Sequence, residues 1–306
     1  MSESKIVTMK ERDMQKVTSK QKWTKIGVQV GLYLFLGIMA LIIVFPFYWM
    51  ILSSLKTKME YEAPIPTFFA QNPWVNGRIN YTEAFRAASL VNLFKNTVIV
   101  GVISTALSLV ITVITAFVFA RLEFKGKNAM FAFLLATMMI PGELFTISNY
   151  QTVSKWGWVK ATTPLAGYGV LIVPFLVSVF YIYLLRQNFL QIPNELYLAA
   201  KVDGTKDLKY LWKVMIPLAL PSIISITILK MMGAWNTYAW PKLVSRKEYY
   251  LITYGLRTAF TDTNTNSANI PAQMAAVTVV SIPLFLVFIF LRKYIMKGVS
   301  RSGIKG

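Results

Sequence analysis

The chain has 306 residues, 55% of them hydrophobic, with 32 lysines and arginines against 13 aspartates and glutamates, a formal net charge of +19. It contains neither cysteine nor histidine, which excludes disulfides, thiolate chemistry and imidazole-based catalysis or metal binding. Several apolar runs exceed the roughly 20 residues that a helix needs to cross a bilayer. The composition therefore predicts a polytopic helical membrane protein.

Six stretches are expected to cross the membrane. Four of them carry no charge, namely residues 26–52, 97–120, 161–185 and 272–291. Two are interrupted, since 129–153 contains Pro141-Gly142-Glu143 and 216–240 carries Lys230 near its middle. We thus expect an all-α membrane protein with six transmembrane helices in one domain, 26–291, between an N-terminal segment, 1–25, and a tail, 292–306.

The distribution of charge predicts the orientation in the membrane. With a cytoplasmic N-terminus, that side holds 20 of the 32 lysines and arginines and the opposite side only 11, although the latter has more residues. The positive-inside rule then places both termini in the cytoplasm. We attribute the basic charge to topology, not to nucleic-acid binding. The run after residue 25 is too long for a signal peptide and lacks a cleavage site, so it should remain as the first helix.

The loop 192–221 is polar and helix-forming, yet lies between two apolar stretches. Asn194 is expected to cap a short helix with Glu195 in its first turn, and Gly204 to end it. Ala199-Ala200 would leave a surface with little side-chain bulk, to which another protein's backbone could come close. Such a helix would fit into a groove on a cytoplasmic partner.

A second helix is expected from Thr205 onward. Its apolar face would bear Leu208, Leu211, Trp212 and Met215, and its other face Lys206, Lys209 and Lys213. An apolar face with tryptophan beside a lysine face is typical of a helix lying in the membrane interface. Pro217 and Pro221 would then mark the turn back into the bilayer. An ordinary basic linker is the alternative.

The run P-x-E-L-x-x-A-A-x-x-D-G at 193–204, followed by Pro217 and Pro221, resembles the EAA loop of permeases from binding-protein-dependent ABC importers. Within the carbohydrate branch the chain looks like the smaller, six-span partner of the maltose-type pair. Further similarity lies, in the same order as in that branch, at 136–143, 233–236, 240–241, 297–298 and 303–306. The resemblance covers roughly residues 26–306.

This resemblance implies a type I ABC importer permease fold in the cell membrane and a set of partners. These are a second permease, two ATPase subunits and an extracytoplasmic solute-binding protein, with a sugar, most simply an oligosaccharide, as substrate and membrane lipid around the spans. ATP and Mg are expected in the ATPase, and no cofactor in this chain. The loop helix would sit in a cleft of the ATPase, so that closure of the ATPase dimer rocks the spans.

The coupling residues carried over from the family are Glu195, Leu198, Ala199, Ala200, Asp203, Gly204 and Pro217. Two positions depart from the family pattern. Leu198 stands where the family has an acid, and Thr205 where it has an alanine. A salt bridge from position 198 is therefore excluded, and either Glu195 or Asp203 must supply any acidic contact. We expect shape and apolar packing to dominate.

Lys230 is the unusual residue, because a charge near the bilayer centre is costly and normally faces a cavity or a partner. We hypothesise that it faces the substrate pathway, which would suit an acidic sugar, or pairs with Glu143; snorkelling toward an interface is the alternative. Trp235, Asn236 and Tyr238, with Trp240, could bind sugar by stacking and amide hydrogen bonds, or form an interfacial aromatic belt.

The same sequence also bears on other functional classes. The chain has no G-x-x-x-x-G-K-[ST] phosphate loop and no G-x-S-x-G elbow, so we expect it to be no enzyme and to leave ATP hydrolysis to another subunit. A channel or a secondary transporter working without an ATPase is the alternative function. It would give the 192–221 loop no use.

Overall fold

The computed structural model describes the backbone of residues 3–260 and 268–300, and the side chains of residues 24–260, 268–290 and 292. The 303–306 end of the tail lies outside these residues. In chain order the helical elements are α1 (Glu3–Ser54), α2 (Lys58–Tyr61), α3 (Pro73–Ala87), α4 (Leu90–Arg121), α5 (Lys127–Thr137), η1 (Gly142–Leu144), α6 (Phe145–Lys155), α7 (Pro164–Ile172), η2 (Val173–Phe175), α8 (Val179–Leu190), α9 (Glu195–Val202), α10 (Asp207–Tyr210), η3 (Leu211–Met215), α11 (Ile216–Asn236), α12 (Ala239–Val244), η4 (Lys247–Tyr249), α13 (Ile252–Ala259) and α14 (Ile270–Ser300).

Within the described residues, 4 helices are long and apolar enough to cross a membrane, and the number rises to 6 if two bent helix pairs each count as one span. The 4 are Thr24–Ser54, Leu90–Arg121, Asp207–Asn236 and Ile270–Phe290. The first bent pair, Lys127–Thr137 with Gly142–Lys155, turns by 81° where the sequence predicts an interruption. Composition and structure thus agree on an all-helical membrane protein.

The predicted stretch 161–185 contains Pro174, which is expected to kink the helix, and the structure shows a full break just after it. Pro164–Phe175 and Val179–Leu190 meet at 54°. Pro174 lies in η2 just before this break, and the Ser178 side chain accepts the Tyr181 backbone N–H at 3.5 Å to start α8 anew. Pro174 removes a backbone donor, which favours the end of one helix, and the Ser178 side chain accepts an otherwise unpaired N–H at the start of the next; together they allow the break.

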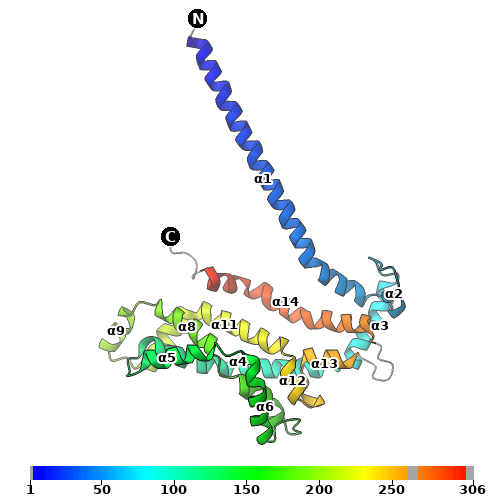
Figure 1. Ribbon diagram of the computed structural model, residues 1–306, viewed down its shortest axis with the longest axis vertical. Helices are drawn as coiled ribbons and strands as arrows, with labels where there is room; N and C mark the ends of the chain where they lie inside the picture. The colour runs from blue at the N-terminus through cyan, green and yellow to red at the C-terminus, as the bar shows by residue number, and fades with distance from the viewer. Residues whose placement is uncertain (1–2, 261–267, 301–306) are drawn as a thin grey trace.

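Helices α4, α8 and α11 pack against one another, α11 also packs on α14, and α14 on α1; Figure 1 shows α14 running alongside this group. Small residues let them approach closely, since Ala272, Ala275 and Ala276 of α14 are fully buried, as is usual for helices packed in membranes. One end of the bundle carries α9 and the end of α14, and the other carries α3, α12 and α13 (Figure 1). Any solute path between the helices must run between these two ends.

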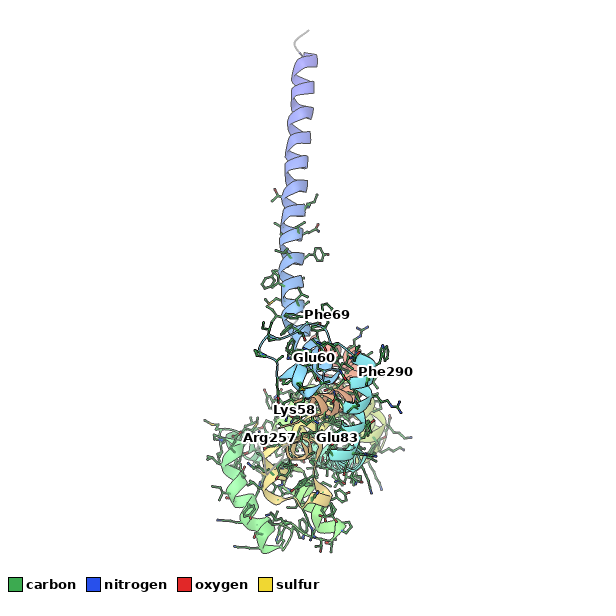
Figure 2. All side chains as sticks on the ribbon, turned by 90° about the vertical axis from the view of Figure 1, so that its right-hand side faces the viewer. Lys58, Glu60, Phe69, Glu83, Arg257 and Phe290 are labelled. Carbon is green, nitrogen blue, oxygen red and sulfur yellow. The ribbon has the colours of Figure 1, made fainter. Side chains whose placement is uncertain are left out.

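Helix α1 stands away from the rest of the molecule, with apolar side chains projecting from it and no neighbouring helix around them (Figure 2). None of the most apolar window within Thr24–Ser54 is buried. Near its end α1 packs on α14, where the Phe47 and Phe285 rings lie 5.3 Å apart. The helix begins at Glu3, so the predicted N-terminal segment continues the first span. Such an apolar surface requires lipid or another subunit to cover it.

Candidate functional site

The start of the 192–221 loop is fixed by Arg121, the last residue of α4. Its guanidinium donates to the carbonyls of Phe189, at 2.8 Å, and Ile192, at 2.5 Å. These carbonyls belong to the end of α8 and the residues just after it, which have no partner within a helix and attract a cation. The side chain is only 7% exposed, so the loop leaves the bundle at a defined point.

Helix α9 begins at Glu195 and ends at Val202, where the sequence predicts a short helix. Asn194 occupies the N-cap position, but its side chain makes no capping hydrogen bond. Gly204, two residues beyond the end of the helix, has a φ of +69°. Its N–H donates to the Lys201 carbonyl at 3.0 Å, and the next N–H, of Thr205, to the Ala200 carbonyl at 2.8 Å. This pair of bonds is a Schellman motif, which depends on glycine's left-handed backbone.

Asp207 ties α9 to the helix that follows it. Its Oδ1 accepts from the Tyr197 hydroxyl at 2.8 Å and lies 2.6 Å from the Lys201 Nζ. The hydrogen bond to Asp207 raises the pKa of Lys201. The pKa of Tyr197 is raised mainly by burial and, to a smaller extent, by its hydrogen bond to the Asp207 carboxylate. The Tyr197 ring also lies 5.1 Å from the ring of Tyr210, which is buried among α4, α8 and α11 residues.

The outer face of α9 is exposed and partly apolar. Leu198 is 55% exposed and Val202 89%, and Glu195, Ala199 and Asp203 are exposed as well. Ala200 differs from Ala199 because it is half-buried and packs against the core under the loop. Apolar side chains on a loop between membrane helices form a surface suited to contact with another protein. The structure therefore divides the predicted alanine pair into an outward and an inward residue.

The second predicted helix of the loop is the first part of a span. Asp207–Asn236 runs as one helix, so Pro217 and Pro221 do not mark a turn, and that prediction is wrong. The expected apolar face is split, with Leu211 and Met215 buried but Leu208 and Trp212 exposed. Pro217 is itself exposed, at the start of α11.

The helix passes Pro217 by widening. Residues Leu211–Met215 form a π-helix, in which the Ile216 N–H donates to the Leu211 carbonyl, five residues back. Pro217 has no N–H and its ring clashes with the carbonyl four residues before it. A π-turn removes that conflict without ending the helix, and such turns occur frequently at functional sites.

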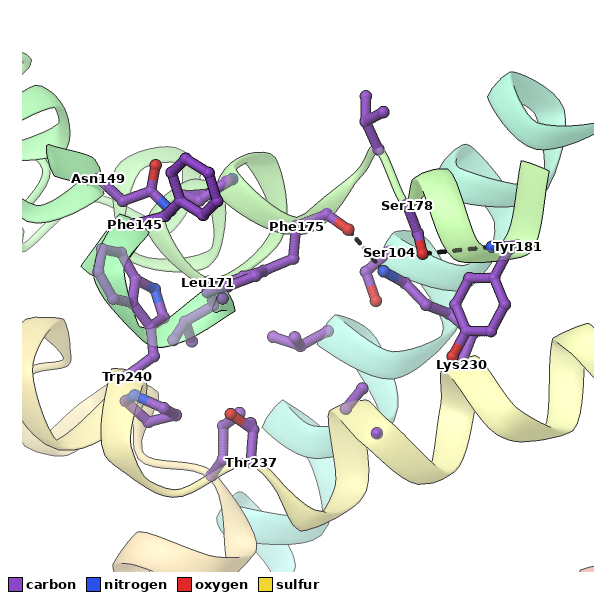
Figure 3. A pocket seen from close by; sticks show the side chains of 18 residues that line it. Ser104, Phe145, Asn149, Leu171, Phe175, Ser178, Tyr181, Lys230, Thr237 and Trp240 are labelled. Carbon is purple, nitrogen blue, oxygen red and sulfur yellow. Dashed lines mark hydrogen bonds between the residues drawn. The ribbon is translucent and has the colours of Figure 1, made fainter. Parts of the chain in front are cut away.

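A cavity of about 590 Å³ lies inside the helical bundle. Its walls come from α4, from η1 and α6 in the first bent pair, from the break between η2 and α8, and from α11 and α12. Figure 3 shows Lys230 at one end of this space and Asn149, Phe145 and Trp240 toward the other. Its polar groups are Ser104, Asn149, Ser178, Tyr181, Lys230 and Thr237, and its aromatic rings include Phe145, Phe175 and Trp240. Charged, hydroxyl, amide and aromatic groups thus meet at one site within the membrane helices.

The Lys230 ammonium donates a hydrogen bond of 2.5 Å to the Phe175 carbonyl (Figure 3). That carbonyl lies at the break before α8, where a helix has ended and its carbonyls need partners. The alternative pairing with Glu143 does not form among the described residues. Glu143 is exposed, whereas its neighbours Gly142 and Phe145 line the cavity.

Of the predicted aromatic and amide cluster, only Trp240 lines the same cavity as Lys230. Trp235 and Asn236 line a separate pocket with α13 and α14 residues, and Trp235 packs edge-on against Phe94. The Tyr238 ring packs against the Tyr254 ring, and the Arg257 guanidinium lies over the Tyr238 ring. Helical spacing explains the separation, because the α11 residues of the cavity are Lys230, Gly233, Ala234 and Thr237, which share one face.

Two side chains, those of Trp240 and Asn96, hold the cavity wall in place with four hydrogen bonds. The Trp240 indole N–H donates to the Val170 carbonyl at 2.9 Å. Asn96 of α4 donates to the Glu248 and Tyr250 carbonyls at 2.8 and 3.1 Å and accepts from the Tyr168 hydroxyl. The cavity residues that sequence reasoning missed come mainly from α4, α6, η2 and α8. Direct packing brings α4 to α11, and the bends of the two broken pairs bring the others, and no local sequence signal encodes that meeting.

Comparisons with known proteins agree with this architecture. The family model "Binding-protein-dependent transport system inner membrane component" matches residues 108–301. AraQ of Halalkalibacterium halodurans, an arabinooligosaccharides transport system permease protein, is 30% identical over 269 residues, 87% of this chain and 93% of that protein. YtcP of Bacillus subtilis, a polygalacturonan/rhamnogalacturonan transport system permease protein, is 29% identical over 293 residues, 90% and 97% of the two chains.

A solved structure shares the fold. The crystal structure of a bacterial ABC transporter involved in the import of the acidic polysaccharide alginate contains a chain that superposes with a TM-score of 0.74 at 23% identity, covering 87% of this chain and 95% of that one. The family match spans more than half of the sequence, including the loop, the cavity's α11 side and the last span. The chain belongs to the binding-protein-dependent transport system inner membrane components, the permeases of ABC importers.

Proposed function

We propose that this chain is the permease subunit of an ATP-driven importer of sugars, in the form of oligosaccharides, and that α9 docks on the ATPase. The names of its relatives support sugar oligomers as substrate. The chain is a membrane component and not an enzyme, so ATP and Mg belong to the ATPase. Partners follow from the family: two ATPase subunits, a solute-binding protein outside the membrane, and a second permease.

The observation that carries the proposal is the connection between loop and cavity. Helix α8 starts at the break beside the Phe175 carbonyl and ends at the loop, held there by Arg121. The helix from Asp207 leaves the loop and carries Lys230 into the same cavity. A force applied to α9 therefore reaches both helices that meet at the Lys230–Phe175 contact.

Each coupling residue has a proposed role on α9. Leu198 and Ala199 form the outward contact, with Glu195 and Asp203 as the acidic groups available to an ATPase cation. Gly204 closes the helix, while Ala200 faces the core and transmits movement to it. Pro217 forces the π-turn that joins this unit to α11.

Orientation and assembly complete the proposal. Helix α9 and the end of α14 share one end of the bundle (Figure 1), and the lysines and arginines of 121–128 and 186–215 support a cytoplasmic location for that end. Both termini would then be cytoplasmic. The exposed surface of α1 supports a second permease, with lipid, as its cover.

Because the chain contains no cysteine, a single introduced one tests the docking directly. Ala199→Cys should form a cross-link with an ATPase subunit that carries a cysteine in its cleft, and the yield should change when ATP closes the ATPase dimer. Thr162→Cys, at an exposed position between α6 and α7, is the control and should give no such product. Sugar uptake by this chain alone in liposomes, without ATPase, would contradict the proposal and favour a channel or secondary transporter.

A further inference from the structure

The lining of the cavity carries positive charge and no negative charge. Of the 18 residues that line it (Figure 3), Lys230 carries the one full charge, and none is an aspartate or glutamate. Of the described carboxylates, the nearest in sequence to a lining residue is Glu143, which is exposed and makes no ion pair with Lys230. A positive group among membrane helices is normally retained for a partner of opposite charge or for a ligand.

The contact that Lys230 does make leaves it able to bind an anion. An ammonium has three donor hydrogens, and the structure gives Lys230 one acceptor, the Phe175 carbonyl. A neutral carbonyl orients the side chain without neutralising it. The remaining donors belong to a half-buried group on the cavity wall, where the low dielectric strengthens a bond to an anion.

The rest of the lining suits a sugar ring. Phe145 and Phe175, 44% and 42% exposed, present aromatic surfaces on which the apolar faces of a pyranose can lie, and the buried Trp240 ring holds Phe175 in place from 5.5 Å away, nearly perpendicular to it. Ser104, Asn149 and Thr237 supply hydroxyl and amide groups for ring hydroxyls. The volume of about 590 Å³ lies within the roughly 300–1,000 Å³ common for ligand pockets.

Building on the proposed function, we infer that the transported substrate is an acidic oligosaccharide, whose uronate carboxylate pairs with Lys230 as it passes through this cavity. The carboxylate takes the free donors of the ammonium, while neighbouring rings bind by stacking and by hydroxyl contacts. The competing explanation is purely structural, namely that Lys230 only satisfies the Phe175 carbonyl. Glutamine separates the two, because its amide can still donate to that carbonyl but carries no charge.

The test uses the complete importer, purified from cells and reconstituted in liposomes with ATP and its solute-binding protein. Uptake of digalacturonate is measured beside that of galactobiose, its uncharged counterpart. Loss of one charge-assisted hydrogen bond predicts that Lys230→Gln lowers digalacturonate uptake by about tenfold or more. Lys230→Arg, which keeps the charge, should retain it. Lys242→Gln, an exposed lysine on α12, is the matched control and should transport normally.

The outcomes separate this inference from the proposed function. ATP-dependent uptake of galactobiose but not of digalacturonate would overturn the acidic substrate and leave the importer intact. Undiminished digalacturonate uptake by Lys230→Gln would overturn the role of Lys230. Uptake of either sugar that needs no ATP would instead overturn the importer. ATPase activity in each variant complex verifies that it has assembled.

Discussion

Gly204 is the residue at which the loop is most sensitive to substitution. Its φ of +69° has open space around it, so a side chain would clash with nothing but would strain the backbone, by about 1–2 kcal/mol. We predict that Gly204→Leu unwinds the end of α9 and uncouples transport, so that sugar uptake falls while ATP hydrolysis continues. Measuring both rates in the same reconstituted complex tests this.

Two variants control for that experiment. Gly126→Leu introduces the same strain at a φ of +82°, also in open space, but before α5, and should leave coupling intact. Leu198→Glu restores an acid at an exposed position of α9 and should be tolerated, with a stability change within about 0.5 kcal/mol. Normal uptake by the Gly204 variant would mean that the shape of the α9 end is irrelevant to coupling.

For single residues, the sequence predicts those whose role depends on their neighbours along the chain, and misses those whose role depends on how the helices pack. Gly204, Asn194 and the ends of α9 follow from local backbone preferences, which neighbouring residues determine. Lys230 was identified because an isolated charge is conspicuous in an apolar run. Trp235 and Asn236 were grouped with it by proximity along the chain, whereas a helix rotates each successive residue by about 100° and sends them to another face.

Among the elements, the end of α8 is fixed at the loop by Arg121. This nearly buried side chain donates to the Phe189 and Ile192 carbonyls. The Phe189 carbonyl also accepts the Ile192 N–H, so the larger loss would fall on Ile192, where a buried acceptor left without a donor costs about 1–3 kcal/mol. We predict that Arg121→Met lowers the thermal unfolding temperature and speeds amide hydrogen exchange at 189–194. Arg78→Met, on the exposed surface of α3, should do neither.

If exchange at 189–194 stayed slow in the Arg121 variant, the anchor would have to lie elsewhere, in the packing of Phe189 and Ile192. Uptake gives a second readout. A loosened α8 should transmit less of any movement at α9, so transport should fall even in detergent-stable preparations of the complex.

The sequence predicts the position of a helix break only where residues that disfavour a helix stand together. Pro141-Gly142-Glu143 signals an interruption by composition, and the structure turns there by 81°. The turn of 54° at 176–178 follows Pro174 in an otherwise apolar run, and the π-turn at Leu211–Met215 precedes Pro217. A proline fixes where a helix must adjust. Packing against other helices decides whether it kinks, breaks or widens.

For the whole molecule, the membrane topology can be tested directly by labelling introduced cysteines, because the chain itself has none. Single cysteines at Lys125 and Thr205 should react with a membrane-impermeant maleimide only after the cells are opened. Cysteines at Glu62 and Thr162 should react in intact cells. The unmodified chain should not react under either condition. A reversed pattern would place α9 outside the cell and exclude its contact with a cytoplasmic ATPase.

Four of the six predicted stretches correspond to helices long and apolar enough to cross a membrane, and the number reaches six if each bent pair counts as one span, since the bilayer itself imposes the hydrophobic length of a span. Their arrangement could not be foretold. The packing of α4 against α8 and α11, and of α14 against α11 and α1, arises from side-chain fit between distant segments, and most of the apolar surface of α1 stays uncovered within the described chain. The cavity is a product of that arrangement. A single sequence reveals which residues are unusual but not which of them meet.

The π-turn before Pro217 also sets an angle. Five residues, Leu211–Met215, occupy this widened turn, and each residue of an α-helix corresponds to about 100° of rotation. Shortening the turn by one residue would therefore rotate everything beyond it by roughly that amount relative to α9. Lys230 would then turn away from the Phe175 carbonyl while Trp212 and the loop kept their places. The five-residue π-turn thus fixes the rotation of α11 relative to α9, and with it the side of α11 on which Lys230 lies.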